Sequence, residues 1–270
     1  MRSGAILAAL VAACGLLLAA VAGAPHATDR PNLLLVTLDT TRADHLGCYG
    51  DRGAATPRLD ALAADGTLCE RSIAVAPLTL PSHASLLTGL YPPGHGVRDN
   101  VDFVLPPGVT TLADHLRGQG YATAAVVGSI VLAGRLGLSR GFDVYDEPRA
   151  PERHDVAGLT VQFEPIAERS AGAVTDAALA ALPSGGRAPF FLWVHYYDPH
   201  APYAPPAPYA ARFAGREYDG EIAYVDAQFG RLVDALLKRG VLDRTLIVVV
   251  GDHGEGLGEH GEATHGYLLH

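Results

Sequence analysis

Fifteen residues near the end of the chain concentrate side chains that bind metal ions. The segment 252–266 holds three His, four acidic residues and five Gly. Carboxylate oxygens and imidazole nitrogens together bind divalent ions, and glycines let the backbone turn tightly around one. A solvated charged loop would explain the acids but not the density of His and Gly. The pattern therefore predicts a metal site with Asp252 and His253 as ligands.

Short apolar runs lead into three residues that can do chemistry. Each run reads as a buried parallel strand, and the carboxyl ends of parallel strands are where such sheets bind ligands. Asp39 could instead cap a turn, and His195 could be a hydrogen-bonded core histidine. We expect these residues to lie around one site: Asp39 ends the run 31–39, His195 ends 190–195 and Asp252 ends 245–252.

The elements that must position these residues alternate along the chain. A fourth apolar run, 122–127, completes the expected strands. Patterns with a helical period lie between the strands, at 57–65, 82–88, 111–119, 170–182 and 220–239. Alternation of this kind predicts an α/β fold with a mostly parallel central sheet sandwiched by helices.

Composition narrows the class of function. The chain has 270 residues, 49% of them hydrophobic and 18% charged, which suits one large or two small globular domains. The net charge of −9 argues against nonspecific nucleic-acid binding, which needs a basic surface. An anionic substrate would need local help from a metal ion or a cluster of donors.

The first part of the chain reads as a targeting segment. Residues 4–24 carry no charge and follow Arg2, so we interpret residues 1–29 as a signal peptide or an N-terminal membrane anchor. A lipoprotein site at Cys14 is a third possibility. All three place residues 30–270 outside the cytoplasm. There, Cys48 and Cys69 could form a disulfide or remain two separate thiols.

One segment carries a resemblance to a known family. Residues 76–89 (APLTLPSHASLLTG) resemble the sulfatase signature, in which Cys or Ser, then x-Pro-Ser-Arg, leads into a Leu-Leu-Thr-Gly helix. Further landmarks of the family lie on both sides of this segment, in family order, at 32–50, 56–64, 95–100, 120–123, 141–143, 195–200 and 252–254. Over residues 31–270 the chain is similar to the sulfatase family of the alkaline phosphatase superfamily. Members of that family usually continue with a smaller carboxy-terminal subdomain, which this sequence is expected to lack.

The resemblance implies a role for each matching residue. One divalent ion, Ca, Mn or Zn, is expected, with ligands at Asp39, Thr40, Thr79, Asp252 and His253. Thr79 matches the nucleophile, and Asn100 matches a polar residue near the substrate oxyanion. His195 matches the histidine near the leaving group. His265 lies where many sulfatases keep a Lys, and so is expected to donate to a substrate oxygen.

Departures from the signature shape the expected function. Thr79 replaces the Cys or Ser that becomes formylglycine, so no formylglycine is expected, and His83 replaces the signature Arg. Gly128-Ser129 stands where arylsulfatases carry Gly-Lys. A Thr nucleophile resembles the lipoteichoic-acid synthases and phosphoethanolamine transferases of the same superfamily.

The main hypothesis is an exported, metal-dependent hydrolase of a sulfate or phosphate ester, with Thr79 attacking. The ester is expected to be small, or linked to a glycan or lipid. A phosphoryl-group transferase acting on envelope lipids or glycans, and a non-catalytic binding protein that keeps the metal loop, are the alternatives.

Some residues keep a structural alternative. Thr79 could simply begin a helix, because Thr favours that position and Pro81 suits a first turn. Asn100 could serve a turn. His200 is interpreted as part of the loop structure. Arg42 could hold Asp44 or an anionic substrate.

Overall fold

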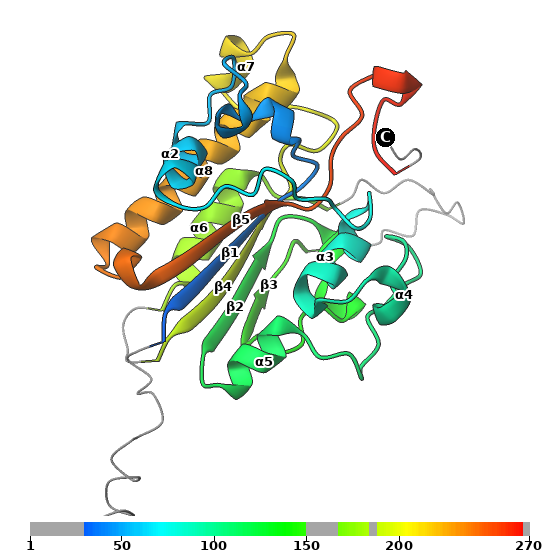
Figure 1. Ribbon diagram of the computed structural model, residues 1–270, viewed down its shortest axis with the longest axis vertical. Helices are drawn as coiled ribbons and strands as arrows, with labels where there is room; N and C mark the ends of the chain where they lie inside the picture. The colour runs from blue at the N-terminus through cyan, green and yellow to red at the C-terminus, as the bar shows by residue number, and fades with distance from the viewer. Residues whose placement is uncertain (1–29, 150–166, 184–187, 267–270) are drawn as a thin grey trace, which may run out of the picture.

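The computed structural model describes residues 30–149, 167–183 and 188–266. Its centre is one five-stranded sheet with the order β3-β2-β4-β1-β5, and every strand pair is parallel (Figure 1). The strands are β1 (Asn32–Leu38), β2 (Ala122–Val127), β3 (Val144–Asp146), β4 (Phe190–Tyr196) and β5 (Thr245–Gly251). The predicted α/β fold with a mostly parallel sheet is confirmed.

Four of these strands are the apolar runs identified in the sequence. The fifth, β3, was not predicted, because it has three residues and only partial burial, too short for a hydrophobic period to emerge. Each predicted helix is also present, with ends that differ by a few residues. The helices are α2 (Pro57–Asp65), α3 (Thr79–Thr88), α4 (Pro92–His95), α5 (Leu112–Gly118), α6 (Ala171–Ala181), α7 (Tyr209–Arg212) and α8 (Glu217–Lys238).

One face of the sheet packs against α2, α6 and α8 (Figure 1). Alternate residues of β1 and β4, such as Val36 and Leu192, meet the apolar stripe of α8. Its buried residues include Ile222, Val225, Phe229, Leu232 and Leu236, a spacing that places them on one side of a helix.

The opposite face packs against α3 and α5. Trp193 of β4 is fully buried there and donates from Nε1 to Thr37 Oγ1 at 3.0 Å. Leu80 and Leu87 of α3 join the same cluster. The residue at the start of α3 is therefore held against the carboxyl end of β1 by a packed helix.

The amino-terminal expectations remain predictions. Residues 4–24 and the domain segment 1–29 lie outside the described residues. Among residues 30–149, 167–183 and 188–266, no helix is both long and apolar enough to cross a bilayer. Cys48 and Cys69 are free thiols in the structure, which is the second of the two alternatives.

A buried carboxylate packs against the loop that follows β4, residues 198–208, which is rich in Tyr and Pro. This carboxylate makes the stability of the fold depend on pH. Glu221 of α8 accepts a hydrogen bond from Ala204 N at 2.7 Å, while its other oxygen is buried without a hydrogen-bond partner among the described residues. Burial raises the pKa of Glu221 to about 8, and the charges of Asp198 and Glu168 act in the same direction. The folded chain therefore binds this proton more tightly than the unfolded chain does.

Replacement of Glu221 by Gln is expected to flatten the dependence of stability on pH. For a carboxyl group with a raised folded-state pKa, stability is highest below the unfolded value and falls as pH rises toward the folded value. Urea unfolding at about pH 5 and about pH 8 measures this slope for wild type and Glu221→Gln. Glu217→Gln, an exposed change in the same helix, is the control. An equally steep decline in Glu221→Gln would contradict the assignment.

Candidate active site

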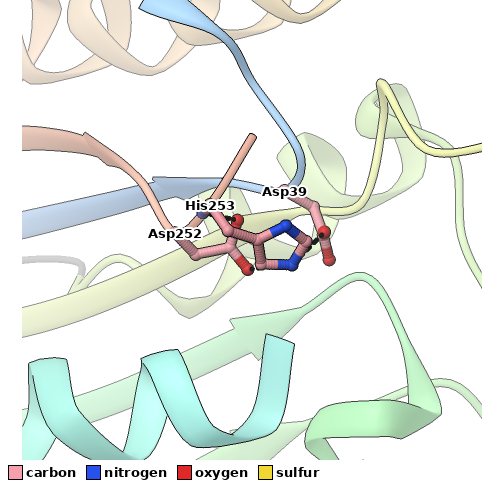
Figure 2. Close-up of side chains that lie close together, drawn as sticks. All are labelled: Asp39, Asp252 and His253. Carbon is pink, nitrogen blue, oxygen red and sulfur yellow. Dashed lines mark hydrogen bonds and ion pairs between the residues drawn. The ribbon is translucent and has the colours of Figure 1, made fainter. Parts of the chain in front are cut away.

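Two carboxylates meet where β1 and β5 end. The register pairs Leu38 with Gly251, so the next residue of each strand, Asp39 and Asp252, leaves the sheet at the same edge. The backbone continues the ladder for one step, with Asp252 N donating to Leu38 O at 3.2 Å. Figure 2 shows Asp39, Asp252 and His253 converging on one point. All three side chains are buried.

These three residues fit a divalent metal ion. One ligand atom from each lies within 4.8 Å of the others. Asp39 Oδ1 and Asp252 Oδ2 are buried and have no hydrogen-bond partner among the described residues. Burial raises the pKa of Asp39 to about 6, and burial followed by the charge of Asp39 raises the pKa of Asp252. Two buried, unpaired carboxylate oxygens side by side are what a cation stabilises.

Hydrogen bonds leave the right atoms free for such an ion. The second oxygen of Asp252, Oδ1, accepts from Thr40 N at 3.1 Å and from His253 N at 2.8 Å. His253 Nδ1 donates to Gly254 O at 2.9 Å, so Nε2 carries a lone pair. That Nε2 lies 3.7 Å from Asp39 Oδ1 and 3.5 Å from Asp252 Oδ2. The lone pairs of all three residues thus face one point.

Thr79 lies directly beside this cluster. It is the first residue of α3, and its Oγ1 lies 3.5 Å from Asp39 Oδ2 and 3.4 Å from His253 Nε2. Asn100 Oδ1 accepts from Leu80 N at 2.8 Å, so this amide satisfies a free N–H group in the first turn of the helix. Because Thr79 begins α3 and lies beside the carboxylate cluster, the positive amino-terminal end of this helix faces the place where an anion would bind.

Comparison with known proteins agrees with this geometry. The family model "Sulfatase" matches residues 31–268. The chain belongs to the sulfatase family. Steryl-sulfatase of Mus musculus is 42% identical over 106 residues, which are 36% of this chain and 17% of that protein. N-acetylgalactosamine-6-sulfatase of Homo sapiens is 28% identical over 87% of this chain and 52% of its own length.

Solved structures share the fold of this sulfatase-family chain. A phosphonate monoester hydrolase of Agrobacterium radiobacter superposes with a TM-score of 0.72 at 24% identity, covering 88% of this chain and 67% of the other. The chain spans 56% of human iduronate 2-sulfatase, so it corresponds to about half the length of the curated relatives it matches. The likeness to the solved phosphonate monoester hydrolase shows a shared fold.

His195 has a different environment from the one expected for this family member. Its side chain is fully buried, Nδ1 accepts from Gly128 N at 3.2 Å, and Nε2 donates to Asp39 Oδ2 at 3.2 Å. Burial lowers the pKa of His195 to about 3. With both nitrogens occupied, this geometry does not support the predicted leaving-group role. It supports the alternative, a core histidine, and here that histidine orients the Asp39 carboxylate.

The sulfatase signature Arg is replaced by a neutral group. His83 Nδ1 donates to Thr79 O at 2.8 Å, and its Nε2 accepts from Thr37 Oγ1 at 3.0 Å. Burial lowers the pKa of His83 to about 3. At this position the chain therefore braces the start of α3 without adding a positive charge.

His265 is the site histidine whose protonation is favoured. Its Nδ1 lies 3.0 Å from Glu255 Oε1, and its ring lies 4.6 Å from the ring of His253. Burial alone would lower the pKa of His265, but the hydrogen bond and charge of Glu255, together with the charges of Asp39 and Asp252, raise it. The structure thus places His265 next to the predicted metal ligands, where the resemblance puts a donor to substrate.

Three further residues change or extend the sequence interpretation. Thr40 donates its hydroxyl to Pro199 O and its N–H to Asp252, so its role as a metal ligand stays a prediction. Arg42 binds Asp44 and Glu259, the first of its two alternatives. His200, assigned to loop structure, stacks on Tyr197 at 4.2 Å and meets the His265 ring at 5.1 Å.

His200 could have been found from its place in the sequence. It follows β4 by four residues, within a Pro-rich loop, so it lies at the same sheet edge as Asp39. Its Nδ1 donates to Ala201 O at 2.8 Å, which leaves Nε2 as the nitrogen available to a ligand. Glu255 could not have been found in this way, because nothing in the spacing separates it from the other acids of the loop.

Proposed function

We propose that this chain carries the catalytic site of an exported, metal-dependent hydrolase that acts on a sulfate or phosphate ester through Thr79. The single observation that carries the proposal is the pair of buried, unpartnered carboxylate oxygens beside the Thr79 hydroxyl. No hydrogen bond from the described residues reaches either of these two oxygens. A cation and the anionic group of an ester would complete the arrangement.

The metal ligands, Thr79 and His195 have different proposed roles. A divalent ion held by Asp39, Asp252 and His253 supplies positive charge that promotes ionisation of a nearby hydroxyl and neutralises charge on the ester. Thr79 Oγ1 attacks the sulfur or phosphorus atom and forms a covalent ester with it, while the bond to the leaving alcohol breaks. His195 holds the Asp39 carboxylate in place through Nε2.

Proton transfer to the leaving alcohol is assigned to His265. Its raised pKa keeps the imidazole protonated closer to neutral pH than its buried neighbours, as a general acid requires. His200 contributes a second imidazole on the same side. Water then attacks the ester on Thr79, its oxygen joins the sulfur or phosphorus atom, and one of its protons passes back to the imidazole. The Thr79 oxygen leaves and regains from solvent the proton that it released to solvent before its attack.

The substrate class follows from the relatives. N-acetylgalactosamine-6-sulfatase and iduronate 2-sulfatase of Homo sapiens are named for sugar sulfates, which supports a glycan-linked ester. Export is supported by the uncharged segment 4–24. The metal is proposed to be Ca, Mn or Zn, since two carboxylates and one imidazole suit all three.

A second candidate is a phosphoryl-group transferase. The observation that favours it is the nucleophile itself, because the hydroxyl of Thr79 cannot become an aldehyde. A covalent ester on Thr79 can pass its group to an alcohol as readily as to water, if an alcohol is bound. The two candidates share every residue of the site and differ only in the acceptor.

Turnover of matched esters distinguishes these functions. We expect the protein, supplied with Ca²⁺, Mn²⁺ or Zn²⁺, to release nitrophenol from at least one of the nitrophenyl sulfate, phosphate monoester and phosphodiester. The preferred ester separates sulfate from phosphate chemistry. Addition of an alcohol acceptor tests the transferase, since transfer product at the expense of free sulfate or phosphate would favour it. Absence of metal-dependent turnover on all three esters would contradict both.

A further inference from the structure

A second carboxylate–imidazole pair lies on the metal loop. Glu255 follows the ligand pair by two residues, and its buried side chain places Oε1 3.0 Å from Nδ1 of His265. The pair is shielded from solvent, with side-chain exposures of 0% for Glu255 and 12% for His265. It is therefore unlike a surface ion pair, in which water weakens the attraction and the side chains move freely.

The contact fixes which nitrogen of His265 faces the site. A carboxylate accepts hydrogen bonds, so Nδ1 carries a proton, and Nε2 is the nitrogen left for a substrate. The ring is packed between His253 at 4.6 Å and His200 at 5.1 Å. Glu255 and these two rings together restrict His265 to one orientation beside the predicted metal ligands.

Burial of Glu255 has a cost that its contacts offset only in part, although the Tyr203 hydroxyl also interacts with this carboxylate. Its Oε2 is buried without a hydrogen-bond partner among the described residues, and a buried carboxylate with an unused oxygen destabilises a fold. The backbone of Glu255 is already held, since Arg42 donates to its carbonyl at 3.3 Å. That backbone contact does not involve the carboxylate, whose Oε1 lies within hydrogen-bond distance of His265.

We propose that Glu255 is the positioning residue of His265. Its carboxylate holds the Nδ1 proton and turns Nε2 toward the leaving oxygen of the ester. This inference rests on the proposed function for the role of His265, and on geometry alone for the pairing. It gives Glu255 a task distinct from metal binding.

Substitution of Glu255 separates positioning from metal binding. Glu255→Leu removes the acceptor, and we expect kcat to fall about 10- to 100-fold, as for other residues that orient a functional imidazole, with KM changed less than about 2-fold. Zn²⁺ affinity measured by calorimetry should fall by a smaller factor than kcat, because Glu255 acts on Asp39 and His253 only through its charge. Glu255→Gln, which keeps an acceptor but no charge, should restore part of kcat. Glu259→Gln removes a carboxylate from the same loop, faces Arg42 and should behave as wild type.

Two further measurements decide the pairing. The double variant Glu255→Leu/His265→Gln should be no slower than His265→Gln alone, because the two residues act as one unit. The ¹⁵N shifts of the His265 ring in Zn²⁺-loaded wild type should show a proton on Nδ1. In Glu255→Leu that proton should be absent from Nδ1 or should exchange between the two ring nitrogens. Multiplicative losses or unchanged ring shifts would overturn the inference. If wild type turns over no ester, the proposed function fails, and the ring shifts still decide whether Glu255 fixes His265.

Discussion

Thr79→Ala is expected to abolish ester turnover, while Asp39, Asp252 and His253 remain to bind the metal. The Thr79 hydroxyl is the buried oxygen placed between the Asp39 carboxylate and His253 Nε2, and Ala leaves no atom there that can attack. Loss of a nucleophile costs on the order of 10⁴- to 10⁶-fold in kcat in well-studied hydrolases. We expect the same range here, measured as release of nitrophenol under saturating metal.

Two controls make this result specific. Thr79→Ser keeps the hydroxyl and should retain a large part of the activity. Thr88→Ala removes a hydroxyl from the last residue of the same helix, where it donates to Ala84 O and accepts from Leu90 N, and should leave kcat near wild type. Turnover by Thr79→Ala at the wild-type rate would show that water, or another residue, attacks the ester directly.

Asp252→Asn is the second change with a large expected effect. It replaces a carboxylate whose Oδ2 has no partner of its own with a neutral amide, so the electrostatic attraction for a divalent ion falls. Because even residues behind a ligand change metal affinity by about 10- to 100-fold, loss of a ligand charge should exceed about 100-fold. Calorimetric titration with Mn²⁺ or Zn²⁺ measures this directly.

The same substitution should change stability in opposite directions with and without metal. In the metal-free protein, Asp39 and Asp252 repel one another in a buried site, so Asn at position 252 should raise the melting temperature. With excess metal the wild type should be the more stable, because ligand binding stabilises the folded state. Asp243→Asn, an exposed change at the opposite end of β5, is the control. Equal metal affinity of Asp252→Asn and wild type would rule out this ion site.

The sheet and the candidate metal ligands Asp39 and Asp252 were predictable from the sequence because their physical signals are local. A buried parallel strand appears as a continuous apolar run, and an acid that ends such a run can lie only at the carboxyl edge. Asp39 and Asp252 were predicted in this way, and the register of β1 with β5 brings them together. The three-residue β3 is too short to leave such a signal.

The side chains that surround the candidate metal ligands could not be predicted, because their positions depend on contacts between loops. His195 and His200 lie five residues apart, and only the fold shows that the first is fully buried while the second stacks beside His265. The pairing of Glu255 with His265 spans ten residues of irregular loop. Neither helical nor strand periodicity constrains such a segment, so its three acids, Glu255, Glu259 and Glu262, are equivalent in the sequence.

The backbone at Thr40 links the fold's stability to its active site. Thr40 has a φ of 48°, a left-handed conformation that a β-branched residue adopts only under constraint. Tyr218 donates to its carbonyl at 2.7 Å, and its N–H binds Asp252. The turn that aims Asp39 therefore holds strain that the rest of the molecule must offset. Variants selected only for heat resistance will tend to relax this turn, and will reach a higher melting temperature at the expense of turnover.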